Sequence, residues 1–337
     1  MKRFILFSLL AFAVCSCLLF APFGAVRAAP MSAIVPAPTV CVPAPTTGKP
    51  AAPNAISFDR AVTLRVLTDG AVQEMSLQTY LLGVLPAEMP TGFPPEALKA
   101  QAVASRTFAL KQAQAHKHLG ADVCASAACC QGRQMPESLS DEQREHVLQA
   151  LLQTDGLVLS YDNALIDATF FSCSGGKTES AVAVWGGDVP YLQAVDSPNE
   201  QAPYDMDSTT LSAAEFAEKF SAVYPQAEFS GDPQAWFSAF TYTDGGGIAT
   251  VCIGGVTVRG TELRKLLQLR STAAELSVTG DNLCFSTRGF GHRVGMSQYG
   301  ARAMAEDGNE FDMILAHYYQ GTALRRLFLE KSSAAAG

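Results

Sequence analysis

Residues 94–110 most constrain the fold, because their composition predicts a long helix with one closely packed edge. Pro94-Pro95-Glu96 opens the segment; proline suits a first helical turn and glutamate suits the positive end of a helix. The interior is rich in alanine, leucine, lysine and glutamine, which are strong helix formers. Other backbone can approach closely along one edge, which carries the small residues Ala97, Ala100 and Ala104.

Pairs of apolar segments around turn residues predict three β-hairpins. The first alternates over residues 62–66, turns at Asp69-Gly70 and returns from Val72. The other two join residues 157–161 to 165–171 around Asp162-Asn163, and residues 248–253 to 256–258 around Gly254-Gly255. Further helices are predicted at residues 76–82, from Thr261, and at residues 313–319. These elements predict an α+β fold of mostly antiparallel hairpins, with helices packed around a substrate cleft.

The N-terminal part of the chain predicts export from the cytoplasm. Met1-Lys2-Arg3 is followed by an apolar stretch over residues 4–21, and Val26-Arg27-Ala28 offers the small residues of a cleavage site. Residues 1–28 are therefore a signal peptide or a membrane anchor, since the stretch is nearly long enough to span a bilayer. We expect the protein to be extracytoplasmic, either secreted or held at the cell membrane by residues 4–21.

Composition divides the remainder of the chain. Residues 29–53 hold seven of the 18 prolines, so residues 29–56 are predicted to form an extended linker. Residues 57–329 are predicted to form one large catalytic domain or two intimately joined lobes, and residues 330–337 a disordered tail.

Charge makes nucleic acid an unexpected partner. The formal net charge is −8, and removal of Lys2, Arg3 and Arg27 makes it −11. No basic run remains after that removal. A polyanionic cell-wall substrate would have to be held by local contacts, and contact with a membrane is expected only through the N-terminal segment.

Three of the nine cysteines are packed into seven residues: Cys124, Cys129 and Cys130. Disulfides are the usual state of cysteines in an exported chain. Close clustering near His118 also allows a metal site. Both possibilities remain open from the residues alone.

Glu88 stands between two prolines in LPAEMP, residues 85–90, at the end of an apolar run. A carboxylate in such a setting needs partners or a chemical task. Its neighbours Leu85 and Met89 should raise the pKa of the carboxyl toward neutrality, as a general acid requires.

Two glycine-rich segments supply candidate binding residues. Residues 171–179 (FSCSGGKTE) are not a phosphate-binding loop, because Phe171 stands where that loop needs glycine. Residues 288–301 interleave glycines with polar side chains suited to sugar hydroxyls. The candidate substrate-binding residues in these segments are Ser174, Gly175, Lys177, His292, Ser297, Gln298 and Tyr299.

Four motifs, in this order, resemble the stage II sporulation protein D family. They are residues 85–90, residues 93–110, residues 288–301 and residues 317–322 (HYYQGT). The resemblance covers most of residues 57–325. It implies a peptidoglycan lytic transglycosylase that cuts between N-acetylmuramic acid and N-acetylglucosamine during engulfment in sporulation. It also implies that Glu88 is the catalytic glutamate and that Arg106 is the family's helix arginine. Because a cation close to Glu88 would oppose the raised pKa of its carboxyl, we expect Arg106 to face substrate.

A zinc site is implied by the clostridial branch of the family, whose His-x5-Cys-x5-Cys spacing matches His118, Cys124 and Cys130. That branch commonly has histidine before the last cysteine, where this chain has Cys129. The fourth position is therefore open to Cys129, Glu88 or water, and the zinc is expected to be structural.

The resemblance implies a one-carboxylate reaction on peptidoglycan glycan strands, expected to be stripped of peptide. Glu88 would protonate the glycosidic oxygen, and the 6-hydroxyl of the sugar would attack C1 to form a 1,6-anhydro ring. A wall amidase and other engulfment proteins are expected partners. Two alternatives are a zinc-dependent wall hydrolase with Glu88 as base, and a non-catalytic wall-binding or amidase-enhancing module.

Overall fold

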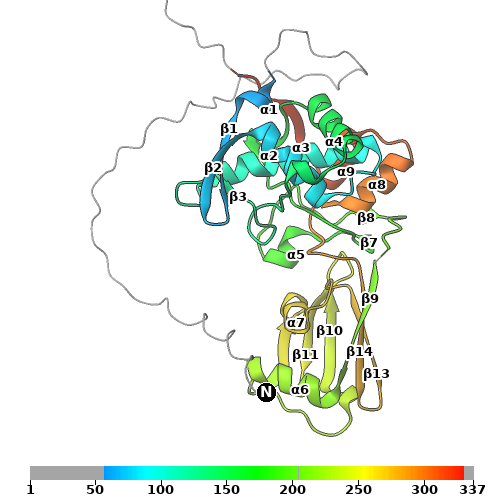
Figure 1. The fold of residues 1–337 in the computed structure, drawn as a ribbon. Helices are drawn as coiled ribbons and strands as arrows, with labels where there is room; N and C mark the ends of the chain where they lie inside the picture. Colours follow the sequence, from blue (N-terminus) through cyan, green and yellow to red (C-terminus); the bar gives the residue numbers. More distant parts are fainter. Residues whose placement is uncertain (1–56, 204, 330–337) are drawn as a thin grey trace, which may run out of the picture. The chain divides into compact units, whose positions relative to one another are not determined.

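A computed structural model describes residues 57–203 and 205–329 (Figure 1). The predicted signal or anchor (1–28), the linker (29–56) and the tail (330–337) lie outside the described residues. Within the described ranges, no helix has the length and apolar character needed to cross a membrane. The division of the chain into these domains stays a prediction.

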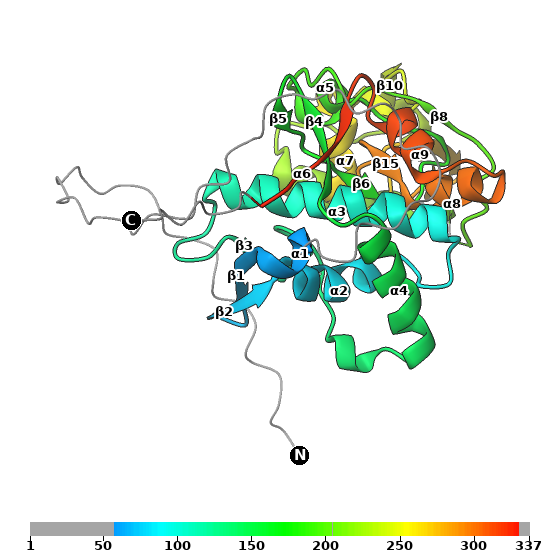
Figure 2. The same ribbon diagram turned by 90° about the horizontal axis from the view of Figure 1, so that it is seen from above.

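Helix α3 (Pro95–Ala115) is the central helix of the first half of the described chain. Figure 2 shows α3 running between α2 and α4 on one side and β4, α8 and α9 on the other, and it packs against all five. The small residues Ala97, Ala100 and Ala104 are fully buried along it, as predicted. The neighbouring elements are α2 (Leu77–Glu88), α4 (Asp141–Gln153), β4 (Leu157–Tyr161), α8 (Gln298–Glu306) and α9 (Phe311–Tyr318).

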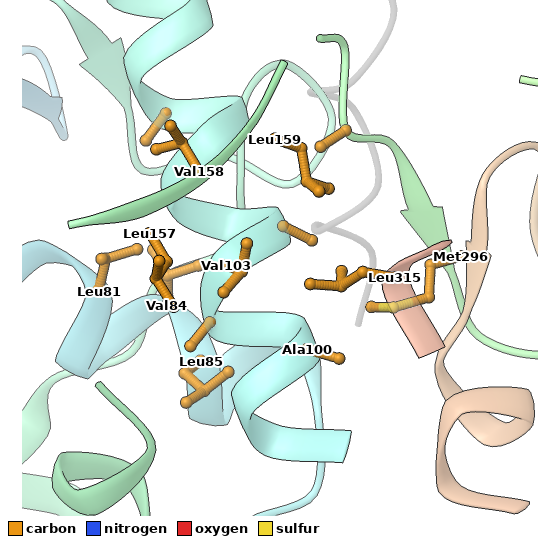
Figure 3. Packing of buried hydrophobic residues seen from close by; sticks show 14 of the residues in the cluster. Leu81, Val84, Leu85, Ala100, Val103, Leu157, Val158, Leu159, Met296 and Leu315 are labelled. Atoms are coloured by element: carbon orange, nitrogen blue, oxygen red, sulfur yellow. The ribbon is translucent and has the colours of Figure 1, made fainter. Parts of the chain in front are cut away.

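The main hydrophobic core surrounds this helix. Figure 3 shows Ala100 and Val103 of α3 between α2, which contributes Leu81, Val84 and Leu85, and the side chains of Met296 and Leu315. Because alanine adds little bulk, the helices on either side can approach α3 closely. The structure thus confirms the closely packed edge that the sequence predicts.

The first predicted hairpin is present as β1 (Thr63–Thr68) and β2 (Ala71–Ser76). Asp69 and Gly70 take φ values of 50° and 81°, as a tight hairpin turn requires. On the other edge of β1, β3 (Val123–Cys124) pairs in parallel, and it brings the cysteine-containing segment to this sheet.

The second hairpin is shorter than predicted. β4 turns at Asp162 and Asn163 into β5 (Ala164–Leu165), and the strand ends there. The following β6 (Phe170–Phe171) pairs instead with β15 (Met296–Ser297), while β16 (Ala323–Arg326) pairs with the other edge of β4. The end of the segment that the sequence pattern assigned to the hairpin, β6, therefore pairs with a strand far along the chain.

Residues 206–288 build a second hydrophobic cluster, centred on Phe216, Phe220 and Phe285. Its two sheets have the strand orders β10-β11-β12 and β13-β14-β9, and β11 and β12 form the third predicted hairpin. The elements are β9 (Met206–Ser212), α6 (Ala213–Val223), β10 (Phe237–Tyr242), β11 (Ile248–Ile253), β12 (Val256–Arg259), α7 (Gly260–Leu267), β13 (Ala274–Thr279) and β14 (Asn282–Arg288).

Short elements complete the described chain: α1 (Phe58–Ala61), α5 (Ala181–Trp185), the antiparallel pair β7 (Gly176–Lys177) and β8 (Asp196–Ser197), and 3₁₀ turns at Pro136–Ser138 and Pro233–Trp236. Helices mixed with small, mostly antiparallel sheets confirm the α+β fold class.

Candidate active site

Glu88 is the last residue of α2, and the flanking prolines fix it there. The helix continues through Pro86, which lacks an N–H to donate to the preceding turn. Met89 leaves helical geometry with φ −130° and ψ 136°, a conformation that suits the residue before a proline. Leu85 and Met89 are buried at 0% and 1% exposure, so the Glu88 carboxylate lies at the helix end next to buried apolar side chains.

The carboxyl group of Glu88 is half-buried and held by a backbone donor. Oε1 accepts a 2.7 Å hydrogen bond from the Gly132 N–H. Burial raises the pKa of Glu88 above its ordinary value of 4.5, and the Gly132 hydrogen bond opposes this rise. A carboxyl that remains protonated above its usual range can donate a proton to a leaving group.

Close packing of residues 131–134 against α2 positions Gly132. Gln134 donates to the Gly83 carbonyl at 3.1 Å, and a Cβ on Gly83 would lie only 2.6 Å from the Gln134 oxygen. The Tyr80 hydroxyl donates to Gln131 at 3.3 Å. Glycine at position 83 therefore lets this segment reach the helix that ends in Glu88.

Immediately before this segment, one histidine and three cysteines converge. His118, Cys124, Cys129 and Cys130 place four potential ligand atoms within 4.8 Å of one another. We call these residues the His/Cys cluster. His118 Nε2 lies 3.2 Å from Cys130 Sγ and 3.7 Å from Cys129 Sγ. All three cysteines are free thiols in the structure.

The donor set fits zinc. Sulfur and nitrogen donors about 2.0–2.3 Å from one zinc ion lie roughly 3.5–3.8 Å apart at tetrahedral angles, close to the separations in the His/Cys cluster. Without a cation the Cys130 thiol is costly to ionise, because burial raises its pKa to about 12. Three cysteines and a histidine are one of the usual sets of structural zinc sites.

The cluster is anchored to the first sheet. Asp122 forms a 2.8 Å ion pair with Arg65, and its N–H donates to the Arg65 carbonyl at 2.7 Å. Ala125 donates to the Leu67 carbonyl at 3.0 Å, so both sides of Cys124 are fixed to β1. The chain then turns at Ser126, whose carbonyl accepts from Cys129 and Cys130.

A hollow of about 790 Å³ begins at Pro90, two residues after Glu88. Glu88 itself does not line it. The walls come from the start of α3, from α4 and from α8, and combine apolar surface with polar ends. The polar and aromatic lining residues are Phe93, Lys99, His146, Gln149, Gln153, Arg302 and Glu306.

Comparison with known proteins identifies the family. The model of the family described as "Stage II sporulation protein" matches residues 68–161. The chain is 36% identical over 265 residues to "Stage II sporulation protein D" of Bacillus subtilis (strain 168), covering 75% of this chain and 76% of that protein. The chain belongs to the stage II sporulation protein D family.

Two further relatives are similar to this chain. "Stage II sporulation protein D" of Bacillus amyloliquefaciens is 37% identical over 262 residues, 74% of each chain. "Amidase enhancer" of Bacillus subtilis (strain 168) is 27% identical over 309 residues, which cover 72% of this chain and 40% of that protein.

The structure corrects the role expected for the family's helix arginine. Arg106 is fully buried, and its guanidinium forms an ion pair with Asp59 at 2.6 Å. It also donates to the Leu157 carbonyl at 3.1 Å. The expectation that Arg106 faces substrate is wrong: its side chain joins α1 to β4 inside the fold.

Ser174 and Gly175 are also occupied within the fold. The buried carboxylate of Glu200 accepts hydrogen bonds from both Ser174 groups, N–H and hydroxyl, at 2.6 and 2.7 Å and from the Gly175 N–H at 3.1 Å. Ser174 is fully buried, so the expectation that it binds substrate is wrong. Lys177, with 43% of its side chain exposed near Asp196, stays a candidate.

The polar residues of the GMSQYG motif lie inside the fold as well. Ser297 is fully buried and caps α8 by accepting from the Gly300 N–H at 3.1 Å, which contradicts a substrate contact. Gln298 and Tyr299 are each only 7% exposed, and the Tyr299 ring packs edge-on against Phe93 at 5.1 Å. The substrate-binding roles predicted for Gln298 and Tyr299 stay predictions, to be met by the small exposed part of each side chain.

Close packing accounts for glycine in this motif. A Cβ on Gly300 would lie 2.0 Å from the Tyr318 hydroxyl, and one on Gly295 would lie 2.1 Å from the Thr169 carbonyl oxygen. The glycines therefore serve contacts between segments of the protein, where the sequence suggested contact with a ligand.

His292 is partly buried with one nitrogen engaged by backbone. Its Nδ1 accepts a 3.1 Å hydrogen bond from the Val294 N–H. Burial, aided by the charge of Arg264, lowers the pKa of His292 to about 4, so the ring is neutral near neutral pH. The ring packs edge-on against Phe171 and lies 5.4 Å from the half-exposed ring of Trp185.

Several residues that stabilise this region were not predicted from the sequence. Arg293 forms a fully buried ion pair with Glu179 at 3.3 Å and also donates to the Gly245 carbonyl at 2.7 Å. Both residues lie in segments that the sequence singled out, but nothing local pairs them. Asp59 and Gly132 also gave no signal, because their roles depend on partners 47 and 44 residues away.

Proposed function

We propose that the protein is an extracytoplasmic lytic transglycosylase that cleaves the bond between N-acetylmuramic acid and N-acetylglucosamine in peptidoglycan. The observation that carries the proposal is the environment of Glu88: a half-buried carboxyl with a raised pKa, fixed by Gly132 at the end of α2. Membership of the sporulation family supports a role in engulfment, with peptide-stripped glycan strands as the substrate.

The reaction needs one carboxyl group. Protonated Glu88 donates its proton to the glycosidic oxygen as the bond to C1 breaks. The 6-hydroxyl of the same muramic acid then attacks C1, and the Glu88 carboxylate takes the hydroxyl proton. The products are a free 4-hydroxyl on the departing sugar and a 1,6-anhydro ring, and no water is consumed. The raised pKa suits the first step, since it keeps the acid protonated at higher pH.

The hollow beside α3, α4 and α8 is the proposed glycan-binding surface. It begins two residues after Glu88, and its volume of about 790 Å³ falls within the range of small-molecule sites. Phe93 is fixed by the Tyr299 edge and by Arg302, whose guanidinium lies 5.4 Å from the ring centre. A fixed aromatic ring among amide and charged side chains is suited to the apolar faces and hydroxyls of sugars.

Zinc in the His/Cys cluster, with Cys129 as the fourth ligand, is proposed as a structural element of this site. Bound there, zinc would supply a crosslink between His118 and the segment that ends at Cys130. Gln131 and Gly132 follow directly, so the position of the Gly132 N–H on Glu88 depends on that segment. The Gly132 N–H then orients the carboxyl group of Glu88.

The two alternatives differ in support. A zinc hydrolase needs a metal with an open coordination position, whereas the His/Cys cluster offers four donors, enough to close a tetrahedral site. A non-catalytic module that assists a wall amidase is favoured by the similarity to "Amidase enhancer". It predicts glycan binding without cleavage.

Mass spectrometry of the fragments released from peptide-stripped glycan tests the proposal. The parent protein should give 1,6-anhydro ends, and Glu88→Gln should bind glycan without releasing fragments. Reducing ends would indicate a hydrolase. Binding without any cleavage by the parent would favour the amidase-assisting alternative.

A further inference from the structure

An exposed tryptophan follows α5 in a segment that the proposed catalytic chemistry does not use. Trp185 is 49% exposed and ends α5, and Gly186, Gly187 and Asp188 after it are exposed. We refer to residues 185–188 as the Trp185 platform. A half-exposed indole costs solvation free energy, and such rings commonly mark binding surfaces.

The Trp185 indole packs against the ring of His292. The centre of the His292 ring lies 5.4 Å from the centre of the Trp185 ring, and Phe171 packs edge-on against His292 at 5.7 Å. Because the pKa of His292 is lowered to about 4, the histidine behaves as a neutral aromatic ring near neutral pH. The indole therefore lies beside an aromatic ring that itself contacts the buried side chain of Phe171.

The short helix beneath the ring is also fixed. The Arg259 guanidinium donates to the Ala183 and Val184 carbonyls at 3.2 Å each, which satisfies two of the last carbonyls of α5. Ala181 is buried and donates to the Leu192 carbonyl at 2.9 Å. A ligand that binds the indole therefore loses little freedom to ordering the protein.

Polar groups beside the ring are open to solvent. A Cβ on Gly186 or Gly187 would meet no atom within 4 Å, so a ligand can approach the backbone there. Within residues 57–203 and 205–329, neither the Trp185 indole N–H nor the Asp188 carboxylate has a hydrogen-bond partner. A donor, an acceptor and a flat apolar face thus lie within four consecutive residues.

We propose that the Trp185 platform is a saccharide-binding subsite that stacks an N-acetylated sugar of the glycan strand on the indole. The choice of ligand rests on the proposed function. A sugar ring has one apolar face of C–H groups for the indole, while its hydroxyls pair with the Asp188 carboxylate and the open glycine backbone. A protein partner is less suited, because the platform offers one ring among polar groups where a protein interface core is a packed apolar patch.

The two tryptophans of the chain allow a direct test. Trp236 lies in the second cluster, where its indole N–H donates to the Ser230 carbonyl at 3.0 Å and its ring packs on Phe229. In a Glu88→Gln background, Trp236→Phe leaves Trp185 as the single emitter, and Trp185→Phe leaves Trp236. Each protein is titrated with the N-acetylglucosamine tetramer while tryptophan emission is recorded. Calorimetry measures binding in parallel.

The expected result is a saturable emission change in the Trp236→Phe protein and none in the Trp185→Phe protein. By calorimetry, Trp185→Ala should weaken tetramer binding by about tenfold, and Trp185→Phe by less because a ring remains. Asp188→Asn, at an exposed site, should weaken binding without changing the thermal midpoint.

Two outcomes would overturn the proposal in different ways. If calorimetry shows tetramer binding by the parent but Trp185 emission is unchanged and Trp185→Ala binds normally, sugars bind elsewhere and only the platform is wrong. If the parent binds no tetramer at all, the glycan ligand of the proposed function fails, and the platform fails with it.

Discussion

The Gly132 N–H donates a 2.7 Å hydrogen bond to the Glu88 carboxylate, and Gly132 follows Cys130 of the His/Cys cluster by two residues. One short segment therefore connects a candidate metal site to a candidate acid.

The pH dependence of cleavage should follow Glu88. Because burial raises its pKa above 4.5, the protonated acid persists to higher pH, and cleavage should fall as pH rises through the raised pKa. Rates measured at saturating glycan across pH check this. A limb that falls near pH 4.5 would show that the acid is an ordinary exposed carboxyl.

The pH dependence of stability tests the raised pKa of Glu88 independently of catalysis. A carboxyl whose folded pKa is raised above 4.5 makes stability fall as pH rises from 4.5 through the folded pKa, because the charged form is disfavoured by burial, and above that pKa the loss is complete. Glu88→Gln should therefore unfold at a higher temperature than the parent at pH 7, and the difference should shrink toward pH 4.5. An equal midpoint at every pH would contradict the raised pKa.

Gly132→Ala should impair catalysis more than binding. The added methyl would lie 3.2 Å from Glu88 Oε1 and 3.5 Å from the Ala127 Cβ, so the carboxylate must move. We expect kcat to fall by about tenfold or more, as misplacement of a catalytic group does, with little change in KM. Normal turnover by this variant would remove Gly132 as the positioning residue.

Arg106→Ala should destabilise the fold, and its effect on glycan affinity should be secondary. The Arg106–Asp59 pair is buried at both ends, so removal of one partner leaves an uncompensated charge and costs about 3–5 kcal/mol of unfolding free energy. Denaturant unfolding measures this. Asp59→Ala should cost a similar amount, and the Arg106→Leu, Asp59→Leu double variant should cost less than the sum. A stable Arg106→Ala protein with weakened glycan binding would restore the substrate-facing role.

Zinc should bind at one ion per chain. Elemental analysis of protein made with metal present and purified without a metal-affinity tag measures it. Cys130→Ser should lose zinc, while Cys252→Ser, a half-buried free cysteine on β11, should retain it. Chelation should also increase hydrogen exchange of residues 116–134. A zinc-free protein with a disulfide mapped to Cys124 would overturn the site.

His292 should make stability fall in mild acid. Its folded pKa of about 4 lies below the ordinary 6.5, so the unfolded chain takes up the proton first as pH falls from 6.5 to 4. That contribution is lost across this window and changes no further below it. Thermal midpoints of His292→Gln should vary less with pH over the window than those of the parent, whereas exposed His146→Gln should match the parent. An unchanged slope in His292→Gln would contradict the lowered pKa.

The sequence by itself determined features that depend on neighbours in the chain. The small-residue edge of α3, the Asp69-Gly70 turn and the apolar setting of Glu88 follow from helix propensity, turn geometry and adjacent side chains. Family motifs in one order also identified the chain. The convergence of His118 with three cysteines agrees with their spacing.

Only the tertiary structure decided which side chains face inward and which meet a partner far along the chain. Arg106 pairs with Asp59 across 47 residues, and Glu200 takes the Ser174 and Gly175 donors across 26 and 25. These polar residues looked like binding groups, because sequence shows their hydrogen-bonding capacity and leaves their partners unspecified. Burial requires each polar group to be satisfied, and the fold chooses the group that satisfies it.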